Sequence, residues 1–461
     1  MSLNERVRAL NSKPFRKDGR YVLYWIRANR RVEANHALLY AAELANQLDL
    51  PLLCLEELDA SSPEAGDRRT AFVLEGVPER EKAFKRLGAG YVFHLYDGTL
   101  KMSEALKRLA REAAAVVTDD HPTLARPPHL AVACFAVDSS CIVPMALIGK
   151  LEYAAYTIRP KIHRYLSRWL EMPPHPRLRR RYQEPSVPSH FSIRESLIPK
   201  VVAGTVGIRV APSLTFSGRR SDALKHLERF LEERLHLFAR LRNEPSAHAT
   251  SDLSPYLHHG LLSPLEVALQ VQRHGAERGV TTGEFLEELI VRRELAFNFT
   301  RYASSYDTLE CLPAWAKKTL LRHRRDRRPQ IYSYVQFEAA ATHDALWNAA
   351  QKELLLRGKI HGYYRMYWGK KIIEWSRSPE EALAVMLRLH KRYALDACGP
   401  NTYAGVLWCF GLHDRPWPER PVFGQVRYMS LEGIRRKTDA SAYLREIEIM
   451  ERSGRDPFRI K

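Results

Sequence analysis

The first 150 residues alternate between short apolar runs, rich in β-branched and aromatic residues, and segments with helical spacing such as Asn35–Leu48. Strands that alternate with amphipathic helices form βαβ units, so this pattern predicts an α/β fold with a doubly wound parallel sheet. No GxGxxG follows the first run, so the sequence gives little reason to expect NAD. The expected strands are Tyr21–Ile26, Leu50–Leu55, Gly90–Tyr96, Ala115–Thr118 and, as a further candidate, Cys141–Pro144.

A change of composition separates this part from the rest of the chain. The segment EMPPHPRLRRRYQEPSVPSH, which begins at Glu171, is rich in proline and arginine and has no periodicity. Such a segment is typical of an extended connection between domains. From residue 221 onward apolar residues recur at three- and four-residue spacing almost to the end. We therefore expect an α/β domain over residues 1–170, a linker over 171–220 and an all-α domain over 221–461.

The charge of the chain narrows the choice of partners. Of the 461 residues, 72 are Lys or Arg and 53 are Asp or Glu, which gives a formal net charge of +19. This excess favours a polyanionic partner, most often nucleic acid, over a basic surface that is merely solvated. Six cysteines without a CxxC pair argue against a disulfide scaffold or a zinc ribbon. With no secretory signal and no apolar stretch of about 18 residues, we expect a reduced, soluble, cytoplasmic protein.

Three tryptophans are spaced as an electron relay requires. Trp368 and Trp375 lie seven residues apart, two turns along one helix face, and Trp347 belongs to the preceding helical segment. Such indoles can pass an electron to a buried redox centre, although core aromatics often show the same spacing. Arg365 shares the helix, and Asp396 follows the next helical segment, where the two side chains can pair.

Two further segments offer polar groups to a ligand. Thr250–Gly260, TSDLSPYLHHG, places hydroxyls and backbone N–H groups before a helix start, which suits a phosphate, although an ordinary helix cap has the same sequence. Glu284–Asn298 places Glu287, Glu288, Arg292, Arg293 and Glu294 in one helix, some of them as i,i+4 pairs on a wet face. A carboxylate on the inner face of that helix costs free energy unless a ligand or a cation meets it.

Aromatic and basic residues gather near the end of the chain. In Asn401–Trp417 and the following ERPVFGQVRYMS, aromatics interleave with Arg415, Arg420 and Arg427, as on surfaces that stack bases and neutralise phosphates. Lys317–Arg328 holds seven Lys and Arg residues within twelve positions. This run predicts a strip that contacts a nucleic-acid backbone, with a solvated loop as the alternative.

Taken together, these segments resemble the class II cyclobutane pyrimidine dimer photolyases of the photolyase/cryptochrome family. The blocks RLRNEP, SDLSPYLHHG, FLEELIVRREL, MYWGKKIIEW and GLHDRPWPERPVFG occur in order, and the resemblance covers nearly the whole chain. It implies an antenna domain, a helical domain that holds FAD, and a monomer acting on UV-damaged DNA. In such enzymes light excites reduced, anionic FAD, directly or through an antenna of deazaflavin or folate type. An electron then opens the ring of a flipped-out dimer and returns.

The resemblance also implies roles for residues at matching positions. Arg365 and Asp396 would pair beside the isoalloxazine ring and favour the reduced, charged flavin. Glu288 would hydrogen-bond the dimer and stabilise the charge that develops on it. Trp368, nearest the flavin, would lead the photoreduction chain through Trp347 and Trp375. The remaining expected contacts are Ser251, Leu253 and Ser254 with the FAD phosphates, Tyr332, Met366 and Trp408 as walls of the lesion pocket, and Arg242 and Arg415 on the distorted DNA.

Some positions depart from the family pattern. His390 stands where the family usually has Asn near flavin N5, and a partly protonated imidazole there would donate to N5, stabilise reduced flavin or change the stable redox state. Phe238 replaces a phosphate-binding Tyr, Phe297 replaces an Asp, and His259 replaces a Phe. Asp138–Cys141 lacks the His-Asn pair of the family, which bears on antenna binding.

These observations leave several functions open. Glu288, Met366, Trp408 and Arg415 favour light-driven repair of cyclobutane dimers. His390 is the strongest feature in favour of a cryptochrome-like photoreceptor without repair turnover. Repair of the other major photoproduct and a light-independent nucleic-acid-binding protein are further alternatives.

Overall fold

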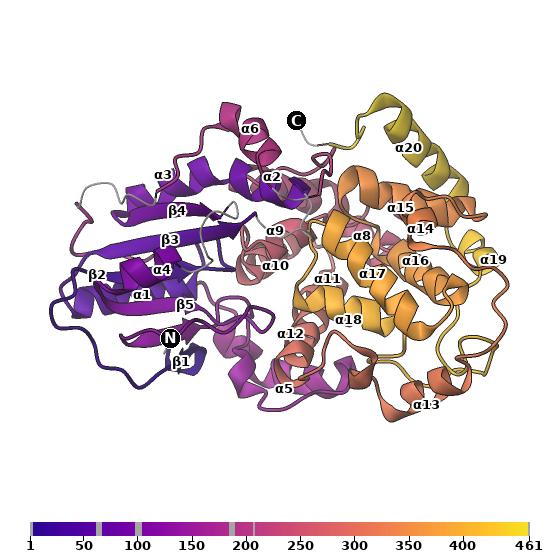
Figure 1. The fold of residues 1–461 in the computed structure, drawn as a ribbon, viewed down its shortest axis with the longest axis horizontal. Helices are drawn as coiled ribbons and strands as arrows, with labels where there is room; N and C mark the ends of the chain where they lie inside the picture. Colours follow the sequence, from indigo (N-terminus) through magenta and orange to yellow (C-terminus); the bar gives the residue numbers. More distant parts are fainter. Residues whose placement is uncertain (1–2, 61–66, 97–103, 184–189, 206–207, 460–461) are drawn as a thin grey trace.

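The computed structural model describes residues 3–60, 67–96, 104–183, 190–205 and 208–459, and it joins an N-terminal α/β part to a helical part (Figure 1). Its sheet has the order β1-β6-β5-β2-β3-β4, with β1 antiparallel to β6 and all the other pairs parallel. The expected α/β class is therefore confirmed. The strands are β1 Val7–Ala9, β2 Tyr21–Ile26, β3 Leu52–Asp59, β4 Gly90–Tyr96, β5 Ala113–Asp119 and β6 Cys134–Val137.

One predicted strand is wrong. Cys141–Pro144 is a buried loop, and the strand that follows β5 in the chain is instead β6, a few residues earlier. The loop's backbone groups are used by side chains instead of a neighbouring strand. The guanidinium of Arg6 donates to the carbonyls of Cys141 and Ile142, while the N–H groups of Ile142 and Val143 donate to Glu294. A run of four apolar residues does not distinguish such a loop from a strand.

Helices cover both faces of the sheet. From β2, the side chains of Val22 and Tyr24 pack in the cluster that includes α1, whereas Leu23 and Trp25 pack in the cluster that includes α4. The alternation follows the two-residue period of a strand. Helix α1 begins after Asn35, whose side chain accepts the N–H of Leu38. The helices of this part are α1 His36–Gln47, α2 Asp67–Glu75, α3 Val77–Leu87 and α4 Glu104–Ala110.

The expected linker lies against the α/β part. Its backbone is hydrogen-bonded to the α/β part, since the N–H of Tyr182 donates to the carbonyl of Gly88 and the N–H of Phe191 donates to the carbonyl of Phe93. The described part of this segment includes the short helix α6 Ile198–Ala203, which packs on α2. Residues 184–189 and 206–207 of the predicted linker lie outside the described residues.

The rest of the chain is helical, and several expected helices are interrupted. The charged segment Glu284–Asn298 consists of α11, the π-helical turn η6 and α12, and a second π-turn, η4, separates α7 from α8. Among the described residues no helix is both long and apolar enough to cross a membrane. The helices and π-turns are α5 Ala155–Trp169, α7 Arg220–Arg229, η4 Phe230–Arg234, α8 Leu235–Leu241, α9 Ser254–His258, α10 Pro264–Arg278, α11 Gly283–Leu286, η6 Glu287–Arg292, α12 Arg293–Tyr302, α13 Ala314–Arg322, α14 Tyr334–Glu338, α15 Ala345–Arg357, α16 Gly362–Trp375, α17 Pro379–Tyr393, α18 Pro400–Trp408, α19 Leu431–Arg435 and α20 Ala440–Ser453.

The two parts of the chain meet in a buried polar contact. Arg31, which is 2% exposed, donates to the carbonyl of Gly260 at 3.1 Å and to that of Ser139 at 2.9 Å. Gly260 has φ +68°, and a Cβ there would lie 2.0 Å from the carbonyl oxygen of Ala28, so a glycine is required. On the helical side, Glu294 of α12 accepts the N–H of Ile142 at 2.5 Å. Burial raises the pKa of Glu294 to about 8, so its carboxyl is protonated at neutral pH.

This contact makes a prediction about stability. Folding raises the pKa of Glu294 from 4.5 to about 8. The stabilisation of the folded state by protonated Glu294 is therefore fully present below pH 4.5 and is lost as the pH rises to 8. Relative to Glu294→Gln, which stays neutral, the wild-type free energy of unfolding should fall by up to about 1.4 kcal/mol per pH unit in this window. Denaturant unfolding of both proteins at several pH values measures the difference. Parallel pH profiles would contradict it.

Candidate functional site

A cavity of about 360 Å³ lies where the two parts of the chain meet. The α/β part contributes Asn29 and Ser140, next to the polar contact just described. The helical part contributes the loop Thr250–Ser254, the start of α16, and residues of η6 and α18. The cavity is therefore completed only when both parts are packed together.

The loop expected to hold phosphates lines this cavity. Ser251, Leu253 and Ser254 are all at its wall. Asp252, at φ +57°, forms ion pairs with Lys359 at 2.5 Å and with Arg234. Burial alone would raise the pKa of Asp252, but these two cations hold it far below its ordinary value. The following helix, α9, has only five residues, so hydroxyls and Lys359, more than a helix dipole, make this end of the cavity suitable for an anion.

The expected ion pair lies at another part of the wall. Arg365 of α16 contacts Asp396 with an Nη2–Oδ2 distance of 3.2 Å, and both residues line the cavity. Burial would raise the pKa of Asp396, but Arg365 lowers it to about 2, so the pair is charged at neutral pH. Arg365 Nε is buried and has no hydrogen-bond partner within the part of the chain that the structure describes. The pair therefore keeps one buried donor for a ligand.

His390 lies behind this pair. It is 1% exposed, its Nδ1 is 3.0 Å from the carbonyl oxygen of Met386, and its ring packs edge-on against Trp368. Burial, together with the charge of Arg365, lowers the pKa of His390 to about 4. The expectation of a partly protonated imidazole near neutral pH is therefore wrong, because a second proton would be buried beside a guanidinium. Neutral His390 donates through Nδ1 and leaves Nε2 as an acceptor.

The three tryptophans form a continuous row. Trp368 lines a small extension of the site together with Arg365 and His390. Its indole stacks on Trp347 of α15 with ring centroids 6.3 Å apart and planes 3° apart, and Trp347 lies 6.0 Å from Trp375. All three are at most 2% exposed. The structure thus places Trp347 between the two indoles of α16, in the order that the resemblance implied.

Tyr332 lies at the outer end of the tryptophan row. Its ring contacts Trp375, with centroids 5.6 Å apart, and its hydroxyl bonds His343 at 2.6 Å. Its backbone N–H also donates to the carbonyl of Trp375 at 3.1 Å, which ties it to the outer end of the tryptophan row. Tyr332 does not line the large cavity. Met366 and Trp408 do not line it either, so the role of Tyr332 as a wall of the lesion pocket stays a prediction.

Glu288 faces the cavity from the π-turn η6. Surrounding protein raises its pKa, while Arg292 and Arg242 partly offset the shift. The neighbouring Glu287 instead pairs with Arg159 of α5 at 2.7 Å and with Arg292. Two adjacent carboxylates thus differ in their surroundings, since Glu287 is bound to cations and Glu288 is directed to the cavity.

The remaining predicted contacts are split between the site and the surface. Met366 and Trp408 lie together around a small cavity with Arg427. Arg242 is near enough to Glu288 to lower its pKa. Arg415 is exposed, and its guanidinium lies 5.6 Å from the ring of Trp417. This arrangement suits a surface that binds a polyanion and aromatic bases.

The basic run Lys317–Arg328 is less available than its sequence predicts. Arg322 pairs with Glu419 at 3.2 Å, and Arg324 pairs with Glu380 at 3.4 Å. Arg328 is buried and donates to the carbonyl of Ser376. Part of the run therefore stabilises the fold.

Sequence reasoning missed other residues of the cavity. Lys359 was not singled out, although a cation three positions before a helix that starts at glycine is a detectable signal. Arg293 lines the cavity, donates to Ser140 at 2.7 Å and lies over the ring of Phe297. Asn401, at the start of α18, also lines the cavity. Neither Arg293 nor Asn401 stands in a local sequence pattern that would mark it as a ligand-binding residue.

The architecture matches that of solved photolyases and cryptochromes. A bacterial class III photolyase from Agrobacterium tumefaciens superposes with a TM-score of 0.70 at 15% identity, covering 97% of this chain and 89% of that one. A cryptochrome from Synechocystis gives a TM-score of 0.69 at 16% identity, covering 92% and 88%. The chain has the photolyase/cryptochrome fold.

Sequence similarity identifies the family. The DNA photolyase family model matches residues 22–177. Proteins named deoxyribodipyrimidine photo-lyase are 40% identical in Methanothermobacter thermautotrophicus, covering 96% of this chain and 98% of that protein, and 38% identical in Potorous tridactylus, covering 96% and 84%. The one from Arabidopsis thaliana is 36% identical, covering 92% and 88%. The chain belongs to the DNA photolyase family and is an enzyme of the photo-lyase class.

Proposed function

We propose that this chain repairs cyclobutane pyrimidine dimers in DNA under light, as a photolyase of class II. The observation that carries the proposal is one cavity lined by both the Arg365–Asp396 pair and Glu288, with Trp368 beside the same arginine. The names of the relatives, all deoxyribodipyrimidine photo-lyases, support the substrate.

We propose reduced FAD as the cofactor of this cavity. The residues fit its chemistry, because hydroxyls and Lys359 suit the phosphates, while Arg365 keeps a buried Nε donor for the ring system. His390, which is neutral, would offer a hydrogen-bond acceptor from behind the Arg365–Asp396 pair. Bound and excited by light, reduced FAD supplies the electron that opens the cyclobutane ring. The positive charge of Arg365 favours an anionic ligand beside it, and Asp396 fixes the orientation of the guanidinium.

The chain's own residues would then receive and polarise the lesion. Glu288, whose pKa is raised by its surroundings, is suited to donate a proton in a hydrogen bond to a pyrimidine carbonyl. Met366 and Trp408 would pack against the pyrimidine rings, and Arg242 and Arg415 would hold the phosphates of the distorted strand. A net charge of +19 supports DNA as the partner. A monomeric state and a cytoplasmic location stay predictions.

We also propose a place for an antenna chromophore of deazaflavin or folate type. A second cavity, of about 310 Å³, lies beyond the carboxyl ends of β2 and β3 and is lined by Trp25, Arg27 and Arg69. Ligands of doubly wound folds bind at such strand ends. Ser140, from the segment that departs from the family pattern, lines the large cavity and not this one. The missing His-Asn pair at Asp138–Cys141 therefore bears less on antenna binding than the sequence suggests.

A cryptochrome-like photoreceptor without turnover is the alternative function. It would need the same fold, the same cofactor and the same tryptophan row. Glu288 at the cavity wall favours lesion binding over this alternative. Met366 and Trp408 line a separate small cavity, so their place in a lesion pocket stays a prediction. The comparison with the cryptochrome supports the fold alone.

The proposal predicts light-dependent repair. Purified chain with bound, chemically reduced FAD should remove thymine dimers from an oligonucleotide under blue or near-UV light and leave them intact in darkness. Chromatography of the digested oligonucleotide measures the dimers. Equal loss in darkness would refute a light-driven reaction. Photoreduction of the flavin without any dimer loss would instead support the photoreceptor.

A further inference from the structure

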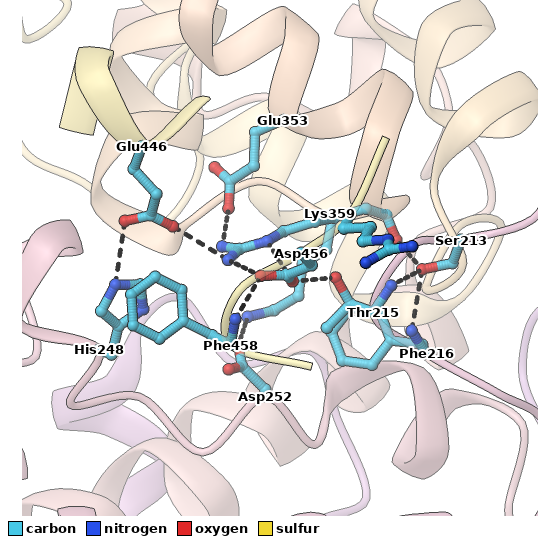
Figure 2. Close-up of polar contacts among 12 residues, drawn as sticks. Ser213, Thr215, Phe216, His248, Asp252, Glu353, Lys359, Glu446, Asp456 and Phe458 are labelled. Atoms are coloured by element: carbon cyan, nitrogen blue, oxygen red, sulfur yellow. Dashed lines mark hydrogen bonds and ion pairs between the residues drawn. The ribbon is translucent and has the colours of Figure 1, made fainter. Parts of the chain in front are cut away.

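The C-terminal end of the chain packs on the outer side of the segments that line the large cavity. Figure 2 shows Glu446 of α20, and Asp456 and Phe458 beyond it, around residues of two such segments. We name these three residues the C-terminal clamp. None of them lines the cavity.

Asp456 anchors the segment that contains Lys359. Its carboxylate accepts two hydrogen bonds from Arg357, from Nε at 2.9 Å and from Nη2 at 3.0 Å, and a third from Thr215 at 2.5 Å. Asp456 is 6% exposed, and although burial would raise its pKa, Arg357 lowers it. Arg357 ends α15 two residues before Lys359, so the bidentate pair fixes the chain just before it enters the cavity wall.

Phe458 anchors the segment that contains the phosphate loop. Its ring stacks on His248 with centroids 3.6 Å apart and planes 26° apart. His248 has φ +49° and precedes Thr250, the first loop residue at the cavity, by two positions. Its Nε2 lies 2.9 Å from Glu446, which also contacts Arg357 at 3.0 Å. Glu446 therefore joins the two anchored segments on the outside.

On the inside, the same two segments are joined by a second ion pair. Lys359 contacts Asp252 at 2.5 Å, and both residues line the cavity (Figure 2). The outer bridge through Glu446 and the inner bridge between Lys359 and Asp252 act on the same pair of segments. The distance between these two segments sets the space available to an anionic ligand at this end of the cavity.

We infer that the C-terminal clamp positions the phosphate end of the cofactor site, so that docking of the clamp and binding of the flavin nucleotide strengthen each other. The inference rests on the proposed function, which supplies FAD as the ligand. Coupling between two binding events is reciprocal: if the docked clamp tightens FAD, bound FAD tightens the clamp by the same factor. The clamp residues are positioning residues, since they act only through Arg357 and His248.

The clamp can be weakened without removing the fold's main contacts. Arg357 also pairs with Glu353 and Glu446, so its charge stays balanced in Asp456→Asn. Phe458 is only partly buried and lies outside the large core clusters, so Phe458→Ala should leave the helical part folded. Glu448→Gln is the matched control, because it breaks the exposed Glu448–Arg452 pair of α20 without touching the clamp.

The first measurement is the dissociation constant of FAD for each apoprotein, by flavin fluorescence, well below the melting temperature. Asp456→Asn and Phe458→Ala should each weaken FAD about tenfold, and the double variant more. Phe458→Tyr should restore the affinity, and Glu448→Gln should match wild type. Wild-type affinity in the folded single variants would overturn the inference.

The second measurement is reciprocal and uses the wild-type chain. FAD should slow tryptic cleavage after the exposed Arg455 by about the factor that the double variant loses in affinity, whereas riboflavin, which lacks the phosphates, should not. A merely structural tail would show no protection by FAD, and that result would overturn the inference even if a variant failed to fold. Failure of wild type to bind FAD would instead refute the proposed cofactor.

Discussion

Replacing Trp368 by phenylalanine should abolish photoreduction of the bound flavin and leave repair by chemically reduced enzyme nearly unchanged. Of the three tryptophans, Trp368 lines the small cavity that shares Arg365 with the large one. Trp347 lies behind it, 6.3 Å farther along between ring centroids, so without Trp368 the first electron step becomes much longer. Phenylalanine keeps the ring contact with His390 but is far harder to oxidise. Repair needs only the electron of an already reduced cofactor.

Two assays separate these outcomes. Absorption spectra under illumination with an external reductant report photoreduction, and dimer loss after chemical reduction reports repair. Trp169→Phe is the matched control, because Trp169 is equally buried but packs in another cluster, near Arg6. Full photoreduction in Trp368→Phe would remove the row from the mechanism. Loss of repair in the pre-reduced variant would show that Trp368 has a different role.

The elements with strong local periodicity could be predicted from the sequence. Tyr21–Ile26 agrees with β2 residue for residue, and Asn35–Leu48 differs from α1 only by its two capping residues. Period-2 and period-3.6 patterns are set by which side of an element is buried, so they are readable before the fold is known. The tryptophan row could be expected for the same reason, since Trp368 and Trp375 share one helix.

Features that depend on distant partners could not be predicted. Cys141–Pro144 has the composition of a strand, but Arg6 and Glu294 satisfy its backbone groups. Tyr332 follows the outer end of the row because its N–H bonds Trp375. The pKa of His390 depends on burial and on Arg365, which lies on another helix.

The features of the site likewise divide into those with a signal in the local sequence and those that depend on distant partners. The Arg365–Asp396 pair was expected from spacing and resemblance, and it is present. The contribution of Asn29 and Ser140 to the cavity was not expected, because it arises only where the α/β part meets the helical part. The clamp of Glu446, Asp456 and Phe458 could not be predicted for the same reason, since its partners lie up to 241 positions away in the sequence.

Replacing Glu288 by alanine should lower the repair yield roughly tenfold or more while changing DNA affinity much less. The carboxyl faces the cavity from η6, and although its side chain is partly open to solvent, desolvation shifts its pKa upward, toward the form that donates a hydrogen bond. Such a donor acts mainly on charge that develops on the lesion, so its loss affects the reaction more than binding. Yield per absorbed photon and binding of a dimer-containing oligonucleotide measure the two effects separately.

The pH dependence and two neighbouring variants make this test specific to the proton of Glu288. Because the folded pKa of Glu288 is raised, the donor is present at low pH, and the wild-type yield should fall as the pH rises through that pKa. Glu288→Gln keeps a neutral donor at every pH, so it should retain most of the yield and lose the pH dependence. Glu287→Gln should leave the yield unchanged, since Glu287 pairs with Arg159 and does not line the cavity. If the Gln variant repaired as poorly as the Ala variant, the carboxylate and not its proton would be required, and the assignment of Glu288 as a hydrogen-bond donor would fail.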